Sequence, residues 1–324
     1  MPPPVRKRVK RSVRSALLRA LIVVFSRVPL RPALAVAGAV GRLAWALAGT
    51  TRRQVLANLA VAFPEKSAGE REAIGRASLT HLARLAAEVA TLRSWRHRLA
   101  DHVSFAPGAE ERLRAALAGG KGLLYVTGHV GNWELMAQRV AALHPSATIA
   151  RAGNDPRLTE LVGLIRAEGK VETLWREDPG TARAMLRCFK QGKLLGMLID
   201  QDTRVQGVFV PFFGRPAFTP RGAADLALRF GVPVLVGWAR RRGPSPGAGH
   251  VVEIVDMPYD PAPVDREAEV VRLTAACTAL LEAAIRAAPE GWVWMHERWR
   301  TQPGDDAVDA QARPMPKTAR KSGG

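Results

Sequence analysis

Apolar and polar residues alternate along this chain in two ways, and each predicts a different kind of element. Over residues 51–99 the apolar positions recur every three or four residues, which is typical of helices, and Pro64 interrupts the run. Ser67 followed by Glu70 has the form of a capping box and predicts the start of a second helix. This part of the chain is therefore expected to be a helical lead-in.

From residue 102 onward, short apolar runs alternate with amphipathic segments. The expected strands are 123–127, 147–150, 194–199, 232–239 and 251–255. The expected helices are 110–118, 133–143, 156–168, 181–191, 221–230 and 266–288. This alternation predicts an α/β fold with a mixed, mostly parallel central sheet flanked by helices.

The N-terminal segment combines basic and apolar residues. Six basic residues stand directly before the apolar run 20–25, and a second run, 33–49, follows after interruptions that include Arg27 and Pro29. A clean transmembrane span needs about 20 uninterrupted apolar residues. The choice is therefore between one imperfect span and a pair of helices lying in the membrane interface. We favour the interfacial helices, since arginines can snorkel from a helix that lies flat, and we expect the N-terminus to be cytoplasmic.

The formal net charge of +19 over 324 residues requires an acidic partner. Nucleic acid, an anionic membrane surface and a phosphorylated substrate are the three candidates. No zinc-finger, RRM-like or helix-turn-helix pattern is present, so we expect no nucleic-acid binding. Basic residues beside an apolar segment instead favour contact with anionic lipid. The two cysteines form no metal pattern, and they fit a reducing compartment.

Three regions follow from these patterns. We expect a basic membrane-associated arm at residues 1–50 and the main folded domain at residues 51–302, of which 51–100 is the helical lead-in. The segment 303–324 is polar and proline-bearing, so we expect a disordered tail.

The segment around His129 carries the best candidate chemistry. A buried strand is expected to end at Gly128, and a helix opens at Asn132 with Glu134 in its first turn. A histidine with a carboxylate in reach has the parts of a general base, and Gly131 allows the backbone to approach a ligand closely. A histidine that is simply hydrogen-bonded at a strand end is the alternative, because the spacing alone is weak.

Five segments in order resemble one family. They are Asn-Leu-Ala-Val-Ala-Phe-Pro at 58–64, Gly-His-Val-Gly-Asn-Trp-Glu at 128–134, Asp-Gln-Asp at 200–202, Val-Phe-Val-Pro-Phe-Phe-Gly at 208–214 and Trp-Val-Trp-Met-His at 292–296. The chain resembles the bacterial lipid A biosynthesis acyltransferases of the late lauroyl/myristoyl type, within the glycerolipid acyltransferase superfamily. The resemblance covers roughly residues 15–300.

The resemblance implies acyl transfer from an acyl thioester to a hydroxyl of a lipid A precursor at the cytoplasmic face of the bacterial inner membrane. His129 would take the proton from the hydroxyl, and Glu134 would orient His129. The donor would be acyl-acyl carrier protein or acyl-coenzyme A, with no other cofactor and no essential metal. No Gly-x-Ser-x-Gly elbow is present, which agrees with direct attack by the acceptor.

The resemblance also suggests substrate-binding residues. Arg151 matches a family arginine thought to contact substrate phosphate or the thioester, although the family's Arg-Pro opening is Arg151-Ala152 here and its Asp-Asn order is reversed at Asn154-Asp155. A simple turn is the alternative for the segment 200–202. The candidate binding set is Gly131, Asn132, Arg151, Asn154, Asp200, Gln201, Asp202 and Arg221.

Two alternatives to this function stay open. The same chemistry could act on another bacterial glycolipid or an aminolipid, such as an acylated mannoside. A non-catalytic membrane-binding relative is the other possibility, and the intact pair of His129 and Glu134 argues against it. The length of the acyl chain depends on pocket depth, and a single methylene changes binding by only about 0.8 kcal/mol.

Overall fold

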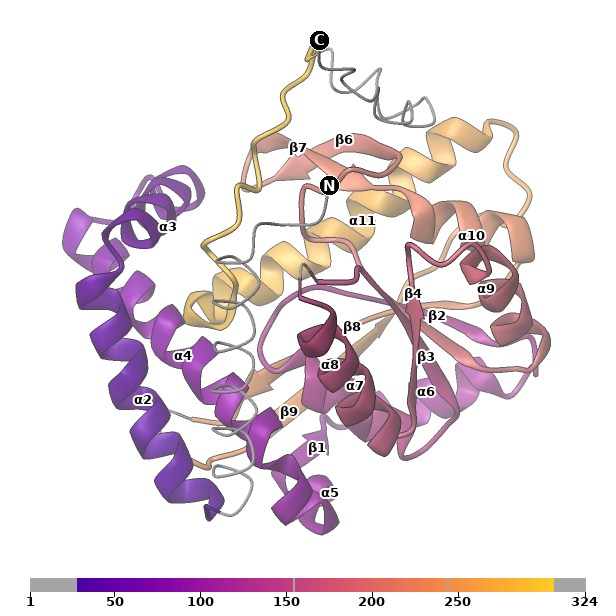
Figure 1. Cartoon of the computed structure of the whole chain (residues 1–324). Helices are drawn as coiled ribbons and strands as arrows, with labels where there is room; N and C mark the ends of the chain where they lie inside the picture. The colour runs from indigo at the N-terminus through magenta and orange to yellow at the C-terminus, as the bar shows by residue number, and fades with distance from the viewer. Residues whose placement is uncertain (1–27, 154, 244, 306–324) are drawn as a thin grey trace, which may run out of the picture.

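A computed structural model describes residues 28–153, 155–243 and 245–305, and a seven-stranded sheet forms its centre (Figure 1). The strands lie in the order β1-β9-β8-β2-β5-β3-β4. Their bounds are β1 Val103–Phe105, β2 Leu123–Thr127, β3 Ser146–Ala150, β4 Val171–Trp175, β5 Leu194–Leu198, β8 Val234–Arg241 and β9 His250–Asp256.

Most neighbouring strands run parallel. In the centre, Leu124 of β2 lies opposite Leu195 of β5 and Val234 of β8. The exception is β9, which runs antiparallel to β8. The expected α/β fold with a mixed, mostly parallel sheet is therefore confirmed.

Helices cover both faces of the sheet, and β2 shows how its side chains divide between them. Leu124 and Val126 face a core shared with α9, α10 and α11, whereas Leu123 and Tyr125 face one shared with α6 and α7. Such alternation follows from the two-residue period of a strand. The helical bounds are α2 Leu30–Leu47, α3 Gly49–Ala62, α4 Ala68–Trp95, η1 Arg96–Arg98, α5 Leu99–His102, α6 Ala109–Leu117, α7 Trp133–Ala141, α8 Pro156–Glu168, α9 Thr181–Lys190, α10 Gly222–Phe230, α11 Arg266–Ala287 and η2 Pro289–Gly291.

The capping box at Ser67 is confirmed. Its hydroxyl accepts a hydrogen bond from the backbone N–H of Glu70, whose carboxylate accepts one from the backbone N–H of Ser67. The sequence patterns did not predict β1 or β4, nor the antiparallel hairpin of β6 (Gly207–Phe212) and β7 (Arg215–Pro220).

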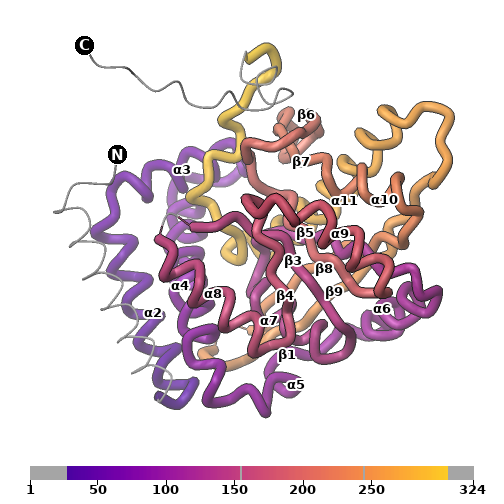
Figure 2. The backbone as a smooth tube through the Cα atoms, turned by 45° about the vertical axis from the view of Figure 1, so that its right-hand side comes forward, coloured from indigo at the N-terminus to yellow at the C-terminus, as the bar shows by residue number. Residues whose placement is uncertain are grey.

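The helices α2, α3 and α4 stand together beside the sheet (Figure 1), and α2 runs along α4 when the molecule is turned (Figure 2). A third apolar cluster joins this helical group to the β6–β7 hairpin and to the tryptophans at 292 and 294. The site described below lies between the sheet and this helical group.

The described part of the N-terminal arm consists mainly of α2. Among the described helices, α2 alone has the length and composition of a membrane span, and a third of its residues are buried in the protein. It also has an exposed apolar face made by Val36, Val40, Leu43 and Leu47. Residues 1–27 and 306–324 lie outside the described residues, so the choice between a span and interfacial helices, and the expected disordered tail, stay predictions.

Two glycines allow α2 and α4 to pack closely. A Cβ at Gly41 of α2 would lie 2.6 Å from the Cα of Thr80 in α4. A Cβ at Gly75 of α4 would lie 2.5 Å from the ring of Trp45 in α2. Both contacts are far inside normal packing distance, so any side chain there forces the helices apart.

We predict that Gly41→Ala lowers the free energy of unfolding by about 1–3 kcal/mol, because the added methyl meets backbone that cannot move alone. Gly49→Ala is the matched control, since a Cβ at Gly49 would meet nothing within 4 Å. Urea unfolding of both variants measures the difference. Equal stability of the two variants would contradict the packing argument.

His81 of α4 is buried and hydrogen-bonds to the backbone of Gly131 in the loop after β2. Burial lowers the pKa of His81 to about 4 from an ordinary value of 6.5, and the charge of Arg241 acts in the same direction. Between these two pH values the unfolded chain binds a proton that the folded protein does not. Folding should therefore weaken as the pH falls through this range.

We predict that stability falls by on the order of 3 kcal/mol between pH 6.5 and pH 4 through His81 alone, since one pKa unit corresponds to about 1.36 kcal/mol. His250, whose pKa is also lowered by burial, adds to the same trend. Denaturant unfolding of wild type and His81→Leu at several pH values tests this. The substitution should flatten the pH dependence, and an unchanged slope would show that His81 is not responsible.

Candidate active site

The loop between β2 and α7 lies tightly against the strand β8. Gly131 has a φ of +63°, and a Cβ there would lie 1.5 Å from the carbonyl oxygen of Ala239. The backbone N–H of Gly131 donates to the carbonyl of Gly291 over 2.8 Å. Only glycine fits this position. The close approach expected at Gly131 is thus made to backbone of the protein itself.

His129 projects from this loop and is held by Asp200, which follows β5. Its Nδ1 lies 2.8 Å from one carboxylate oxygen of Asp200, and its backbone N–H donates to the other oxygen over 2.6 Å. The indole N–H of Trp292 donates to that second oxygen over 2.8 Å. With Nδ1 occupied, Nε2 is the ring nitrogen that remains to accept a proton, and the His129 side chain is 23% exposed.

Asp200 keeps its negative charge although it is only 2% exposed. Burial raises the pKa of its carboxyl, but the charge of His129 and the hydrogen bonds from His129 and Trp292 outweigh burial and lower the pKa to about 2. An ionised Asp200 stabilises the protonated form of the imidazole. The arrangement has the parts of a histidine general base with its orienting acid.

Other groups surround the His129 ring. The amide nitrogen of Gln201 lies 3.0 Å from Nδ1, and the ring of Trp133 makes an edge contact at 4.8 Å between centroids. The ring of His296 lies 6.2 Å away. Burial lowers the pKa of His296, and the charge of His129 lowers it further, which favours a neutral second histidine at the site.

Glu134 does not make the contact expected of it. Both of its carboxylate oxygens accept hydrogen bonds from the guanidinium of Arg166 in α8, one of them over 2.9 Å. The carboxylate in contact with His129 is that of Asp200 and not that of Glu134, and the catalytic roles expected of His129 and Glu134 stay predictions. Glu134 and Arg166 instead border a small, mostly apolar cavity of about 40 Å³ between α7 and the sheet.

A second buried carboxylate, that of Glu88, fixes the loop between β2 and α7 to the helix α4. Glu88 of α4 is fully buried and accepts hydrogen bonds from Arg241 over 2.8 Å and 3.2 Å and from the amide of Asn132 over 2.8 Å. It also lies 2.9 Å from the Nε2 of His250. The other amide atom of Asn132 caps α7 by accepting from the backbone N–H of Leu135. Asn132, expected to bind substrate, is thus buried and fully occupied by protein.

Burial raises the pKa of Glu88, yet the charges and hydrogen bonds of His250, His102 and Arg241 hold it well below its ordinary value. Glu88, His102 and His250 are the one group of possible metal ligands found among the described residues. The guanidinium of Arg241 on the same carboxylate disfavours a divalent cation there. The expected absence of a metal stays a prediction.

The remaining predicted residues have varied surroundings. The side chain of Asp202, only 1% exposed, accepts hydrogen bonds from Thr301 and Arg300 and so fixes the C-terminal segment. Arg221 is held by Asp225 and Glu267, whose hydrogen bonds raise its pKa. Arg151 is exposed just after β3. Asn154 lies outside the described residues.

The structure therefore brings together His129, Asp200 and Gln201 from the predicted set. Sequence reasoning missed the contributions of Glu88, Arg166 and Trp292, which lie 41 residues before, 37 after and 163 after His129. No local spacing links such distant positions. Only the resemblance at 292–296 marked Trp292, and it gave this residue no role.

Comparison with known proteins identifies the family of this chain. The model of the family described as bacterial lipid A biosynthesis acyltransferase matches residues 6–301. A lipid A biosynthesis lauroyltransferase of Escherichia coli (strain K12) is 27% identical over 265 residues, covering 81% of this chain and 83% of that protein. A phosphatidylinositol mannoside acyltransferase of Mycobacterium tuberculosis (strain CDC 1551 / Oshkosh) is 25% identical over 229 residues, or 69% of each chain. The match over nearly the whole chain shows that this protein belongs to the bacterial lipid A biosynthesis acyltransferase family and is an acyltransferase.

Proposed function

We propose that this acyltransferase moves a fatty acyl group from an acyl thioester to a hydroxyl of a lipid A precursor or a related glycolipid. The observation that carries the proposal is the pair of His129 and Asp200, in which Nδ1 is held by the carboxylate while 23% of the His129 side chain stays exposed. The site lies at the ends of β2 and β5, where a rigid parallel sheet positions catalytic side chains.

In the proposed reaction, Nε2 of His129 takes the proton of the acceptor hydroxyl while the oxygen attacks the thioester carbonyl. The tetrahedral intermediate then expels the thiolate, the C–S bond breaks, and the imidazolium returns its proton to sulfur. Asp200 stabilises the imidazolium throughout by its fixed negative charge.

The state of the two cysteines supports direct transfer of the acyl group from thioester to acceptor, without an acyl-cysteine intermediate. Cys188 and Cys277 are both buried in the core shared with α9, α10 and α11. Burial raises the pKa of both thiols, that of Cys277 to about 12. Such thiols are poor nucleophiles, so an acyl-enzyme on cysteine is not part of the proposal.

The ion pair of Glu134 and Arg166 would affect catalysis indirectly, without contact to His129. This ion pair joins the first turn of α7, the helix that follows His129, to α8. The side chains of Glu134 and Arg166 are both about 15% exposed. In the proposal, Glu134 matters for activity because it fixes Arg166 and α8 beside the site.

The donor and the acceptor are proposed by class. A basic chain suits an acidic donor protein such as acyl carrier protein, and a coenzyme A thioester carries the same phosphopantetheine. The lauroyltransferase relative favours a lipid A precursor, and the mannoside acyltransferase relative keeps an acylated mannoside as the second candidate. The exposed apolar face of α2 supports attachment to the cytoplasmic face of the inner membrane.

We predict that His129→Ala and Asp200→Asn each lower kcat by about 10²–10⁴-fold, the usual range for loss of general base catalysis. Asp200→Asn keeps the shape of the side chain, so its loss reports the missing charge. Acyl transfer from a labelled thioester to purified acceptor measures both. Near-normal turnover in His129→Ala would support a different catalytic group or a non-catalytic membrane protein.

The indirect role proposed for Glu134 is tested by comparing the turnover of three variants, which are Glu134→Ala, Arg166→Ala and the double variant. If Glu134 acts through Arg166, the double variant should be no worse than the more impaired single variant, because the two substitutions remove one shared interaction. Losses that multiply would show that Glu134 has a role independent of Arg166. Cys188→Ser and Cys277→Ser should both retain turnover.

A further prediction concerns substrate binding by Arg151. An exposed arginine that contacts a substrate phosphate contributes a charge-assisted bond of about 1.5–3 kcal/mol, which is roughly ten- to a hundredfold in binding. Arg151→Ala should therefore raise the KM for a phosphorylated acceptor by this factor without lowering stability. Arg183→Ala, exposed on α9, is the control. Equal KM values for phosphorylated and dephosphorylated acceptor with the wild type would exclude this contact.

A further inference from the structure

The helix α4 contacts the loop between β2 and α7 at two points. His81 hydrogen-bonds to the backbone of Gly131, and the carboxylate of Glu88 accepts a hydrogen bond from the side-chain amide of Asn132 over 2.8 Å. His81 and Glu88 are about two helical turns apart, so they lie on one face of α4. The loop that carries His129 is therefore fixed to this helix as well as to the sheet.

Asn132 joins the contact with Glu88 to the start of α7. Its side chain is fully buried, and its amide nitrogen can only donate while its amide oxygen can only accept. The nitrogen donates to Glu88, and the oxygen accepts from the backbone N–H of Leu135 over 3.1 Å. Because an ionised carboxylate only accepts hydrogen bonds, Glu88 fixes the direction in which the amide faces. A displaced Glu88 would disturb both the loop and the first turn of α7.

Glu88 is held in turn by groups from three further elements. Arg241 of β8 donates to both of its oxygens, over 2.8 Å and 3.2 Å. The Nε2 of His250 in β9 lies 2.9 Å from one oxygen, and the Nε2 of His102 in α5 lies 3.4 Å from the other. Burial raises the pKa of Glu88, but the charges and hydrogen bonds of these partners hold it well below its ordinary value. An ionised carboxylate thus links α4 to β8, β9 and α5.

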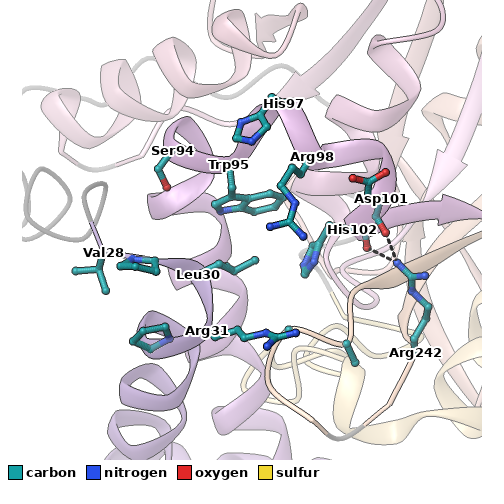
Figure 3. A pocket seen from close by; sticks show the side chains of 14 residues that line it. Val28, Leu30, Arg31, Ser94, Trp95, His97, Arg98, Asp101, His102 and Arg242 are labelled. Carbon is teal, nitrogen blue, oxygen red and sulfur yellow. Dashed lines mark hydrogen bonds between the residues drawn. The ribbon is translucent and has the colours of Figure 1, made fainter.

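His102 is itself held by its surroundings (Figure 3). Its ring makes an edge contact with the ring of Trp95 at 4.8 Å between centroids. The guanidinium of Arg242 donates to the backbone carbonyls of Asp101 and His102, over 2.6 Å and 3.1 Å. His102 lines the open cavity of about 920 Å³ drawn there but is only 9% exposed. These contacts fix the position of one partner of Glu88.

Two buried carboxylates therefore act on the segment that carries His129. Asp200 contacts the ring and the backbone of His129 directly, whereas Glu88 holds the loop at Asn132. Proton transfer depends on the position of the ring nitrogen, and a displacement of about 1 Å can cost about a hundredfold in rate. A buried ion pair is weak evidence for a purely stabilising role, because well-packed apolar residues often stabilise a protein equally well. The contact with Asn132 points instead to the geometry of the loop.

We propose that Glu88 is a positioning residue for acyl transfer, which acts through Asn132 to set the loop between β2 and α7. Glu88 is fully buried, so it acts without contact to the substrate. The inference rests on the proposed function, because it takes this loop to carry the general base. It extends the machinery of the reaction to the helix α4, in the helical lead-in.

The test exchanges the two side chains that meet. In Glu88→Gln a single oxygen must serve both Asn132 and Arg241, and in Asn132→Asp two carboxylates meet, so each substitution alone spoils the contact. In the Glu88→Gln/Asn132→Asp double variant the introduced amide can donate to the introduced carboxylate, and its oxygen can accept from Arg241. Aspartate caps a helix as well as asparagine does. Glu269→Gln is the matched control, because Glu269 of α11 is a buried carboxylate that pairs with Arg272.

Each single variant should lower kcat by about ten- to a hundredfold, because the loop that carries His129 is displaced. The KM values for donor and acceptor should hardly change. The double variant should recover most of the loss in kcat, since the two substitutions act on one shared contact. Glu269→Gln should keep the kcat of the wild type even where it lowers stability. Urea unfolding of every variant separates lost folding from lost turnover.

A normal kcat in Glu88→Gln would overturn the proposal, and so would a double variant in which the losses of the single variants multiply. Should Glu88→Gln fail to fold, Asn132→Asp leaves the pair of Glu88 and Arg241 in place, and a normal kcat in that variant would overturn the proposal too. Failure of the proposed function gives a different result. His129→Ala would then keep its turnover, while the exchange of side chains still reports whether the contact of Glu88 with Asn132 controls the rate.

Discussion

A carboxylate that is buried and still charged needs hydrogen-bond donors around it, and at Asp200 this requirement organises the site. The donors are the backbone and ring of His129 and the indole of Trp292, which come from the loop after β2 and from the C-terminal segment. Two distant parts of the chain are thereby fixed to the end of β5. The same contacts that satisfy the buried charge also hold the imidazole in one orientation.

A second buried carboxylate supports the same loop from the opposite side. Glu88 fixes the amide of Asn132, which caps α7, while Gly131 rests on the backbone of β8. The loop is therefore attached to α4, to β8 and, through Gly291, to the C-terminal segment. Such attachment from several elements holds the partly exposed His129 in one place, which is the fixed geometry that the proposed proton transfer requires.

The fold was predictable where one kind of pattern dominated. The strand β2 is buried along its whole length, and β5 and β8 are buried at their starts, so all three appear as continuous apolar runs. β4 at the sheet edge has an exposed Glu172 and a mixed pattern. The β6–β7 hairpin carries prolines, which argue against strands, but its two strands pair only with each other, so each has a free edge where proline is tolerated.

The site was only half predictable for a related reason. Spacing along the chain identified His129 and suggested that Glu134 could contact it. The direction of the Glu134 side chain, however, is set by its position in the first turn of α7. Leu135 and Met136 turn toward the core, which leaves Glu134 at the flank of α7, where it meets Arg166 of α8. The carboxylate that contacts His129 instead follows the neighbouring strand, because the parallel pairing of β2 and β5 puts both of their carboxyl ends at one edge. Sheet order, which the sequence did not specify, therefore decides which carboxylate lies beside the histidine.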